Sequence, residues 1–195
     1  MIRKLFIIAA ILGITAASTW AQETARQQIF IYANIPDISE GASSEESLGR
    51  YANEAHKDEI TVLGFNEKIT QNVTFNWQHR AYDIGMYEIY PITFLKHIDK
   101  TTPLLERKHF YQGLLYSITF SFYRLNQDSG ELELVMTKKF QDCYITNIDK
   151  IVLNQGEHAH LDLPMMEKVT FIFERVTTTH NKTGTQSTTD AINRY

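Results

Sequence analysis

The sequence predicts a mainly β domain, a β-sandwich or barrel, with one short helix. Three observations lead to this prediction. Apolar residues alternate with polar ones in several stretches, turn-forming residues separate those stretches, and one segment carries both helix-start and helix-stop residues. The chain has no internal repeat and no linker rich in proline or glycine, so we expect a single domain.

The first half of the chain contains extended segments around one long polar loop. Period-two alternation in the third of these segments places Ile69, Val73, Phe75 and Trp77 on one face, as in a half-buried strand. The polar loop spans 36–58 and contains a region, 45–54, that can form a short helical turn. The expected strands are 27–35, 59–64, 65–77 and 84–95.

The helix is expected at about 103–112. Thr102 can cap it, because its hydroxyl can accept a free amide proton of the first turn. Pro103 then occupies the first helical position, where its missing N–H is not needed, and Gly113 suits a left-handed end. Such a helix is too short to be stable alone in water, so it must pack against the barrel or cap one end of it.

The second half of the chain contains the clearest strand, 114–125. Tyr116, Ile118, Phe120 and Phe122 share one face of that strand, which fixes its register. Residues 126–130 form a turn, in which Gly130 suits a positive φ. Further strands are expected at 132–140, 143–153 and 167–177, with a second loop at 154–163 and with Val169, Phe171 and Phe173 alternating in the last strand.

The two ends of the chain have residue patterns that are not typical of a folded β domain. Arg3 and Lys4 precede an uncharged run, 5–17, that is too short to span a bilayer as a helix, and small residues follow at Thr19 and Ala21. We therefore expect a signal peptide at 1–21, cleaved after Ala21, and a secreted or periplasmic protein; an uncleaved anchor is the alternative. Residues 22–178 are expected to form the domain, and 179–195 a polar tail that is ordered only if something docks on it.

Composition narrows the classes of function. Without residues 1–21, the chain has 174 residues with 17 basic and 23 acidic side chains, which argues against nucleic acid or an anionic membrane as partner. The lone Cys143 allows no internal disulfide and is expected to be a buried structural thiol. His158 and His160 are too few to hold a metal. We expect no enzyme activity, no catalytic residue, no metal and no cofactor.

The segment Phe94–Leu105 carries the most specific signal. It reads strand, then Ile-Asp-Lys-x-Thr-Pro, then a short helix, and it resembles the haemolysin-coregulated protein (Hcp) family of type VI secretion systems. The family signature falls on Ile98, Asp99, Lys100, Thr102 and Pro103. Segments 29–35, 59–65, 140–148 and 167–174 resemble other strands of the family, and their order and spacing together strengthen the resemblance.

The resemblance implies a flattened antiparallel β-barrel of two sheets with one helix at its side. It further implies hexameric rings that stack into a hollow, secreted tube, with the chain itself, a sheath, a spike and effectors as partners. Residues 70–86 would form a hairpin arm that reaches the neighbouring ring through Phe75, Trp77, His79, Arg80 and Tyr82. The alternative for Phe75 and Trp77 is that they fill the domain's own core.

Two features depart from the family pattern. Tube proteins of this family lack a signal peptide, so the chain is alternatively an exported Hcp-like binding module that acts in the periplasm or outside the cell without forming a tube. Residues 189–193 also lack the aromatic residue that the family often has near its end. A secreted enzyme is a third hypothesis, which no residue pattern supports.

Overall fold

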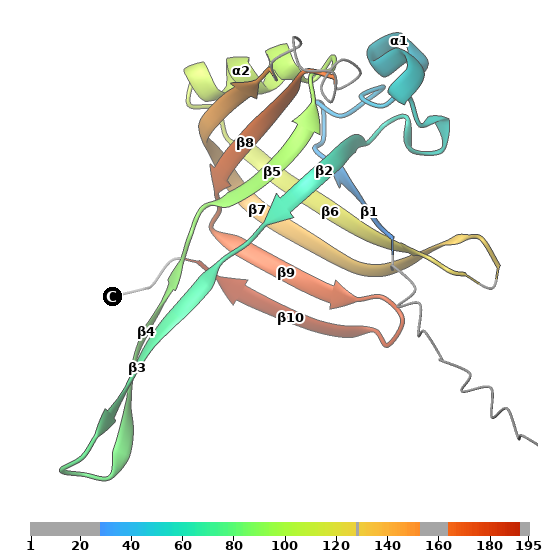
Figure 1. Ribbon diagram of the computed structural model, residues 1–195. Coiled ribbons are helices and arrows are strands. Elements are labelled where there is room, and N and C mark those ends of the chain that lie inside the picture. Colours follow the sequence, from blue (N-terminus) through green and yellow to red (C-terminus); the bar gives the residue numbers. More distant parts are fainter. Residues whose placement is uncertain (1–27, 128, 153–163, 192–195) are drawn as a thin grey trace, which may run out of the picture.

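The computed structural model describes residues 28–127, 129–152 and 164–191 (Figure 1). The signal peptide expected at 1–21 and the loop expected at 154–163, with His158 and His160, lie outside these residues. The helices are α1 Glu45–Leu48 and α2 Thr102–Phe110, with single 3-10 turns at Gly49–Tyr51 and Glu54–His56. The strands are β1 Ile29–Asn34, β2 Ile60–Asn66, β3 Ile69–Asn76, β4 Ala81–Ile89, β5 Ile92–His97, β6 Leu115–Leu125, β7 Leu132–Ile151, β8 Met166–Ile172, β9 Arg175–His180 and β10 Thr185–Asp190.

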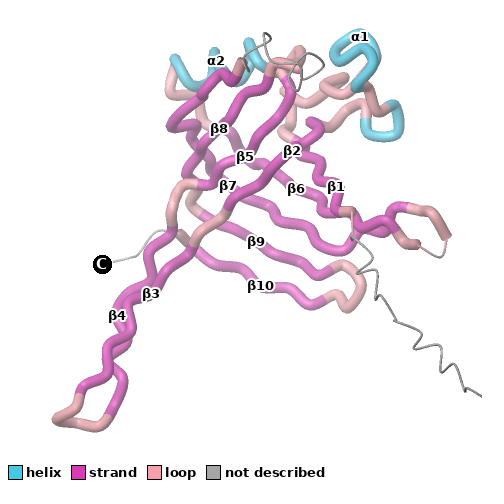
Figure 2. Tube along the Cα trace, viewed as in Figure 1, coloured by secondary structure: helices cyan, strands magenta, loops and turns pink. Residues whose placement is uncertain are grey.

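Eight of these strands form one antiparallel sheet in the order β10-β9-β7-β6-β1-β2-β5-β8. Because β8 also pairs with β7, six of them close into a barrel, and the β9–β10 hairpin attaches to the outer side of β7. The other two strands, β3 and β4, form a separate sheet that projects away from the barrel (Figure 2). The prediction of a mainly β fold of two sheets with few helices is confirmed.

Strand β7 differs from its prediction. The sequence predicts two strands, 132–140 and 143–153, whereas the structure has one strand of 20 residues. The chain continues through Asp142, which adopts a φ of 53°. Residues as far as Cys143 pair with β6, those between Met136 and Gln141 pair with β9, and those from Tyr144 onward pair with β8. A single left-handed residue therefore bends the strand, so that it belongs to both sides of the closed barrel.

The core forms from the alternating apolar residues that the sequence indicates. Ile118 and Phe120 of β6 are buried, as are Val169 and Phe171 of β8. Phe120 packs edge-on against Phe94 and Phe140 at centroid distances of 5.4 and 5.8 Å, a favourable geometry for aromatic rings. Tyr116 was expected on the same face, but it is 75% exposed. It lies at the start of β6, next to the end of α2.

Both ends of α2 also correct the prediction. Thr101, not Thr102, holds the N-cap position, and no side chain caps the helix. The left-handed residue at the other end is Gln112, with a φ of 49°, rather than Gly113. The amide of Gly113 donates to the carbonyl of Lys108 at 2.7 Å and that of Gln112 to His109 at 3.2 Å, which is the Schellman pattern. A Cβ at Gly113 would lie 2.8 Å from Lys108 Cδ, so a larger residue there would require the Lys108 side chain to shift.

The expected polar tail is in part a hairpin. Residues of β10 pair with β9 from Thr185–His180 to Asp190–Arg175, and β9 pairs in turn with β7. Every residue of β10 is exposed, so backbone pairing rather than apolar burial holds this strand in place. The loop 36–58 matches its prediction better, because α1 and the two 3-10 turns lie within 45–56, while Ile38 and Ala42 anchor the loop in the core.

Candidate functional site

The β3–β4 hairpin is the first candidate site, and we call it the arm. It extends well beyond the barrel, on the side away from the two helices (Figure 1). The pairing register of β3 with β4 shifts between Gln71 and Val73. At this point β4 carries Gly85, where a Cβ would lie 3.1 Å from the Asn72 carbonyl oxygen. A bulge at this point increases the local twist of the arm.

Three of the five predicted arm residues come together at the tip. The ring of Phe75 contacts Trp77 at 4.7 Å and Tyr82 at 5.1 Å, both edge-on. His79 and Arg80 lie in the turn beyond this cluster and are exposed. Asn76 shapes the turn, because its side-chain oxygen accepts hydrogen bonds from the amides of residues 78 and 79.

The arm exposes apolar side chains on both strands. Trp77 is 82% exposed, Tyr82 67% and Phe75 37%. The alternative that Phe75 and Trp77 fill the core of the domain is therefore wrong. The other large apolar residues of the arm are similarly exposed, and they are Ile69, Val73, Ile84 and Met86. Such a contiguous apolar surface is unusual on a monomer and typical of an interaction site.

The base of the arm is fixed to the barrel. Glu67 pairs with Lys138 of β7. The hydroxyl of Tyr87 donates to the carbonyl of Asp190 at the end of β10, at 3.0 Å. The Asp190 carboxylate in turn accepts from Arg175 at 2.7 Å. These contacts hold the base of the arm, while its aromatic tip contacts no other element of the described chain.

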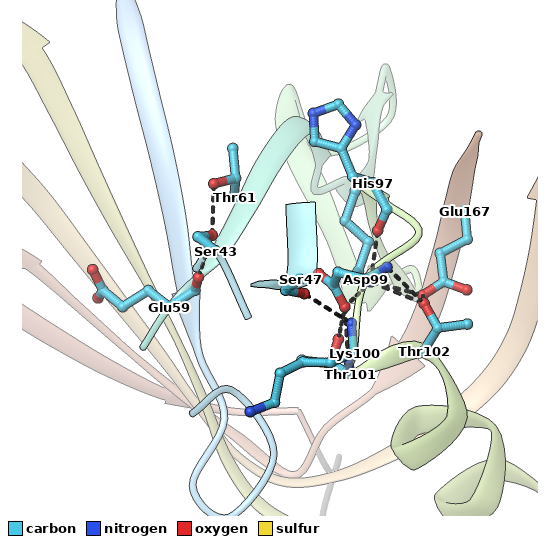
Figure 3. A network of polar contacts seen from close by, with 11 residues as sticks. Ser43, Ser47, Glu59, Thr61, His97, Asp99, Lys100, Thr101, Thr102 and Glu167 are labelled. Carbon is cyan, nitrogen blue, oxygen red and sulfur yellow. Dashed lines mark hydrogen bonds and ion pairs between the residues drawn. The ribbon is translucent and has the colours of Figure 1, made fainter. Parts of the chain in front are cut away.

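The signature segment forms a second candidate site, a buried ionic network at the junction of β5 and α2 (Figure 3). Lys96 Nζ lies 2.9 Å from Asp99 Oδ1 and 2.9 Å from Glu167 Oε1, and all three side chains are at most 1% exposed. The same ammonium group donates to the carbonyl of His97 at 2.8 Å. Thr102 donates its hydroxyl proton to Glu167 at 2.8 Å.

Asp99 orders the chain that leads into α2. Its carboxylate accepts from the amide of Thr101 at 2.7 Å and from the Thr101 hydroxyl at 2.6 Å. The amide of Lys100 donates to Ser47 of α1 at 3.0 Å, and the amide of Ile98 donates to the carbonyl of Met165 at 3.1 Å. Asp99 and Thr102 of the signature are therefore buried structural residues, whereas Lys100 and Pro103 are exposed.

Sequence reasoning did not single out Lys96 and Glu167 as site residues, although a signal for them was present. Lys96 continues the buried parity of Ile92 and Phe94 along β5. Glu167 does the same beside Val169 on β8, and the register places it directly opposite Lys96. Two opposite charges at inward positions of neighbouring strands predict a buried ion pair.

His97 borders this network. Its ring stacks on Tyr51 at a centroid distance of 5.1 Å, and its Nδ1 is buried without a hydrogen-bond partner in the described chain. Burial lowers the pKa of His97; nearby Asp99 acts in the opposite direction, and Lys96 lowers it further. The neutral imidazole is therefore favoured in the folded protein.

The thiol group and the potential metal ligands of the described residues offer little reactive chemistry. Cys143 is buried as predicted, and burial, with Asp142 nearby, raises the pKa of its thiol to about 12, which makes it a poor nucleophile at neutral pH. No group of three or more potential metal ligands occurs within residues 28–127, 129–152 and 164–191. Within the same ranges, no helix is long and apolar enough to cross a membrane.

Comparisons with known proteins agree with this geometry. Residues 32–180 match the family model described as "Type VI secretion system effector, Hcp". The "Major exported protein" of Pseudomonas aeruginosa strain PAO1 is 26% identical over 153 residues, which cover 78% of this chain and 87% of that protein.

Solved structures show the same fold. A structure titled "Crystal structure of Hcp protein" superimposes with a TM-score of 0.73 at 27% identity, over 86% of this chain and 99% of that one. Secreted protein Hcp3 from Pseudomonas aeruginosa has a TM-score of 0.66 at 23% identity, with the same coverage of both chains. Because the family model matches most of the chain, from β1 to the end of β9, the protein belongs to the Hcp family of type VI secretion system proteins.

Proposed function

We propose that this protein is a ring-forming tube subunit of a type VI secretion system. Six copies form a ring, and rings stack head to tail into a hollow tube that is secreted and carries effectors. The main support is the arm, which holds Trp77 and Tyr82 exposed at a distance from the barrel. A side-chain cluster of this kind is costly to keep in water and fits a contact with a neighbouring ring.

The roles of the candidate residues follow from this proposal. Phe75, Trp77 and Tyr82 are the anchors of the stacking contact, and His79 and Arg80 are polar contacts at its rim. The buried network around Lys96 holds α2 on the barrel and has no direct contact with a partner. A contractile sheath, a spike and small effector proteins are the further partners that the proposal includes. The name of the Pseudomonas relative, a major exported protein, agrees with a secreted product.

The test is the mass of the protein in solution, measured by light scattering behind gel filtration over a concentration series. The sample is purified from cells that express the whole chain. Particles of six subunits support the proposal, and a second population of multiples of six at high concentration supports stacking.

A monomer at every concentration contradicts the tube proposal. It would favour the alternative of an exported Hcp-like binding module, for which the leader pattern in residues 1–21 is the specific observation. A pull-down that retains one partner on the monomer would then identify that activity.

A further inference from the structure

A second apolar surface lies at the end of α2, far from the arm. We call it the α2 aromatic patch, and it consists of Phe110, Tyr111, Tyr116 and Tyr144. Their exposed fractions are 78%, 82%, 75% and 40%. None of the four has a ring contact with another member of the patch, so the rings are not stabilised by packing on one another. Their exposure calls for a covering surface.

Strand register places two members of the patch, Tyr116 and Tyr144, on one outward face. Leu115 of β6 pairs with Cys143 of β7, and both are buried. Tyr116 and Tyr144, the residues that follow each of them, therefore point outward and are diagonal neighbours. Two hollows on either side of Lys108 join these residues to α2. One, of about 160 Å³, is lined by Tyr116 and Lys108 together with Asp37 of the loop after β1, and the other, of about 410 Å³, by Tyr144, Gln112 and Lys108.

The patch has a basic border. Arg107 is exposed, and it forms no ion pair with another residue of the described chain. Lys108 uses its ammonium group to donate to the carbonyl of Leu114 at 3.2 Å. The acidic neighbour on the helix, Glu106, is already paired with Lys150 of β7 at 2.6 Å. Arg107 and Lys108 therefore place positive charge beside the apolar centre, in a hollow that Asp37 also lines.

A complementary surface exists on the same molecule. Residues 37–59, which include α1, contain seven acidic and two basic side chains, and we call them the acidic segment. Glu40, Glu45 and Glu46 are exposed there and make no ion pair with another described residue. Figure 1 shows α1 and α2 at the same end of the barrel, and α1 lies beside the start of α2, because Ser47 accepts a hydrogen bond from the Lys100 amide at 3.0 Å.

We propose that the α2 aromatic patch of one copy docks on the acidic segment of a second copy. Two different surfaces, one at the end of α2 and one around α1 beside the start of α2, form a heterologous contact, which closes into a ring when the rotation allows it. The arm lies at the other end of the barrel, so the same contact leaves it free for stacking. This inference rests on the proposed function, because it names the surfaces that join neighbours within a ring.

Cross-linking tests which surfaces meet. The variant carries Tyr111→Cys and Glu46→Cys in one full-length chain and is treated with a short bismaleimide. The native Cys143 gives little background, because it is buried and its pKa is about 12. We expect a covalent ladder up to six subunits. The chains that carry only Tyr111→Cys or only Glu46→Cys should run as monomers on the denaturing gel. A control chain that carries Ser187→Cys with Glu46→Cys should also run as a monomer.

Charge exchange tests the same contact without cysteine. Arg107→Glu should raise the concentration needed for half-assembly at least about tenfold, because like charges then face each other. Adding Glu46→Arg to the same chain should restore most of the loss, whereas Glu46→Arg combined with native Arg107 should assemble as poorly as the first variant.

The possible outcomes are distinct. If the wild type is a ring but the double cysteine variant gives no ladder, the docking inference is wrong and the tube proposal stands. Covalent dimers of the Tyr111→Cys variant alone would show that two patches face each other, which also overturns the inference. A wild type that is monomeric at every concentration overturns both proposals together.

Discussion

At the scale of the residue, Lys96 has the largest expected effect on stability. Its ammonium group is fully buried between Asp99 and Glu167. Replacing it with methionine leaves two buried carboxylates without a cation, which we expect to lower the free energy of unfolding by about 3–5 kcal/mol. Urea unfolding measures this change. Lys168→Met is the matched control, since Lys168 pairs with Asp149 at the surface and should cost at most about 1 kcal/mol. Equal losses in the two variants would contradict the role of the buried network.

His97 gives a prediction about pH. Burial holds its pKa below the ordinary value of about 6.5 in the folded protein. As the pH falls below 6.5, the unfolded chain therefore binds a proton that the folded protein does not, and stability decreases. His97→Phe keeps a ring against Tyr51 but cannot titrate. Between pH 7 and pH 5 the wild type should lose more stability than this variant, by up to about 1.4 kcal/mol per pH unit. Parallel curves would show that His97 does not titrate in this range.

Charged core residues show what sequence reasoning captures at this scale. The buried positions of Phe120 and Phe171 follow from period-two alternation alone. Asp99 is named from the sequence only as a member of the family signature, without a role or partners. Lys96 and Glu167 lie 71 residues apart and become a pair only when β5 and β8 are known to be neighbours. Pairing of distant strands is the information that a single sequence does not contain directly.

At the scale of the element, the arm predicts a separation between folding and assembly. Trp77→Ala with Tyr82→Ala removes exposed rings, so the barrel should lose no more than about 1 kcal/mol of stability. Ring stacking should be lost, because the tip anchors are gone. Electron microscopy at high concentration measures stacking, and light scattering measures the single ring, which should persist.

Phe94→Ala is the control for that experiment. Its ring is fully buried, so we expect a loss of about 3–5 kcal/mol and partial unfolding. A Trp77→Ala/Tyr82→Ala variant that unfolds as readily as Phe94→Ala would show that the arm contributes to the core. A variant that still stacks like the wild type would show that the contact between rings lies elsewhere.

The prediction missed β10 and the continuity of β7 for two different physical reasons. β10 has the sequence TQSTTD, in which no apolar residue marks an inward face, and it forms through backbone pairing with β9. The continuity of β7 depends on Asp142 adopting a positive φ, which a non-glycine residue seldom does. By contrast β6, with its run of alternating aromatic residues, is predicted to within one residue of its observed start. Alternation identifies strands that bury side chains and misses those that only extend an edge.

At the scale of the whole molecule, the two ends of the subunit differ. The arm projects at one end, and the two helices, with the α2 aromatic patch and the acidic segment, occupy the other (Figure 1). A subunit with an arm at one end and two different surfaces at the other can contact neighbours along a stack and around a ring at the same time. This arrangement accounts for two separate exposed aromatic surfaces on one small barrel, each of which would be a liability for a monomer.

The compartment in which such a subunit assembles depends on whether it is exported. The test of the predicted leader at 1–21 therefore also tests where a ring forms. We expect intact-mass measurement of the protein recovered from the periplasm or medium to show a chain that begins at Gln22, because Thr19 and Ala21 are small residues at the positions that signal peptidase reads. Ala21→Tyr should block cleavage and leave the uncleaved chain of 22.6 kDa with the membrane fraction. An intact N-terminus on soluble wild-type protein would contradict the leader and place ring assembly in the cytoplasm. A processed N-terminus would mean that any ring forms after the leader has been removed.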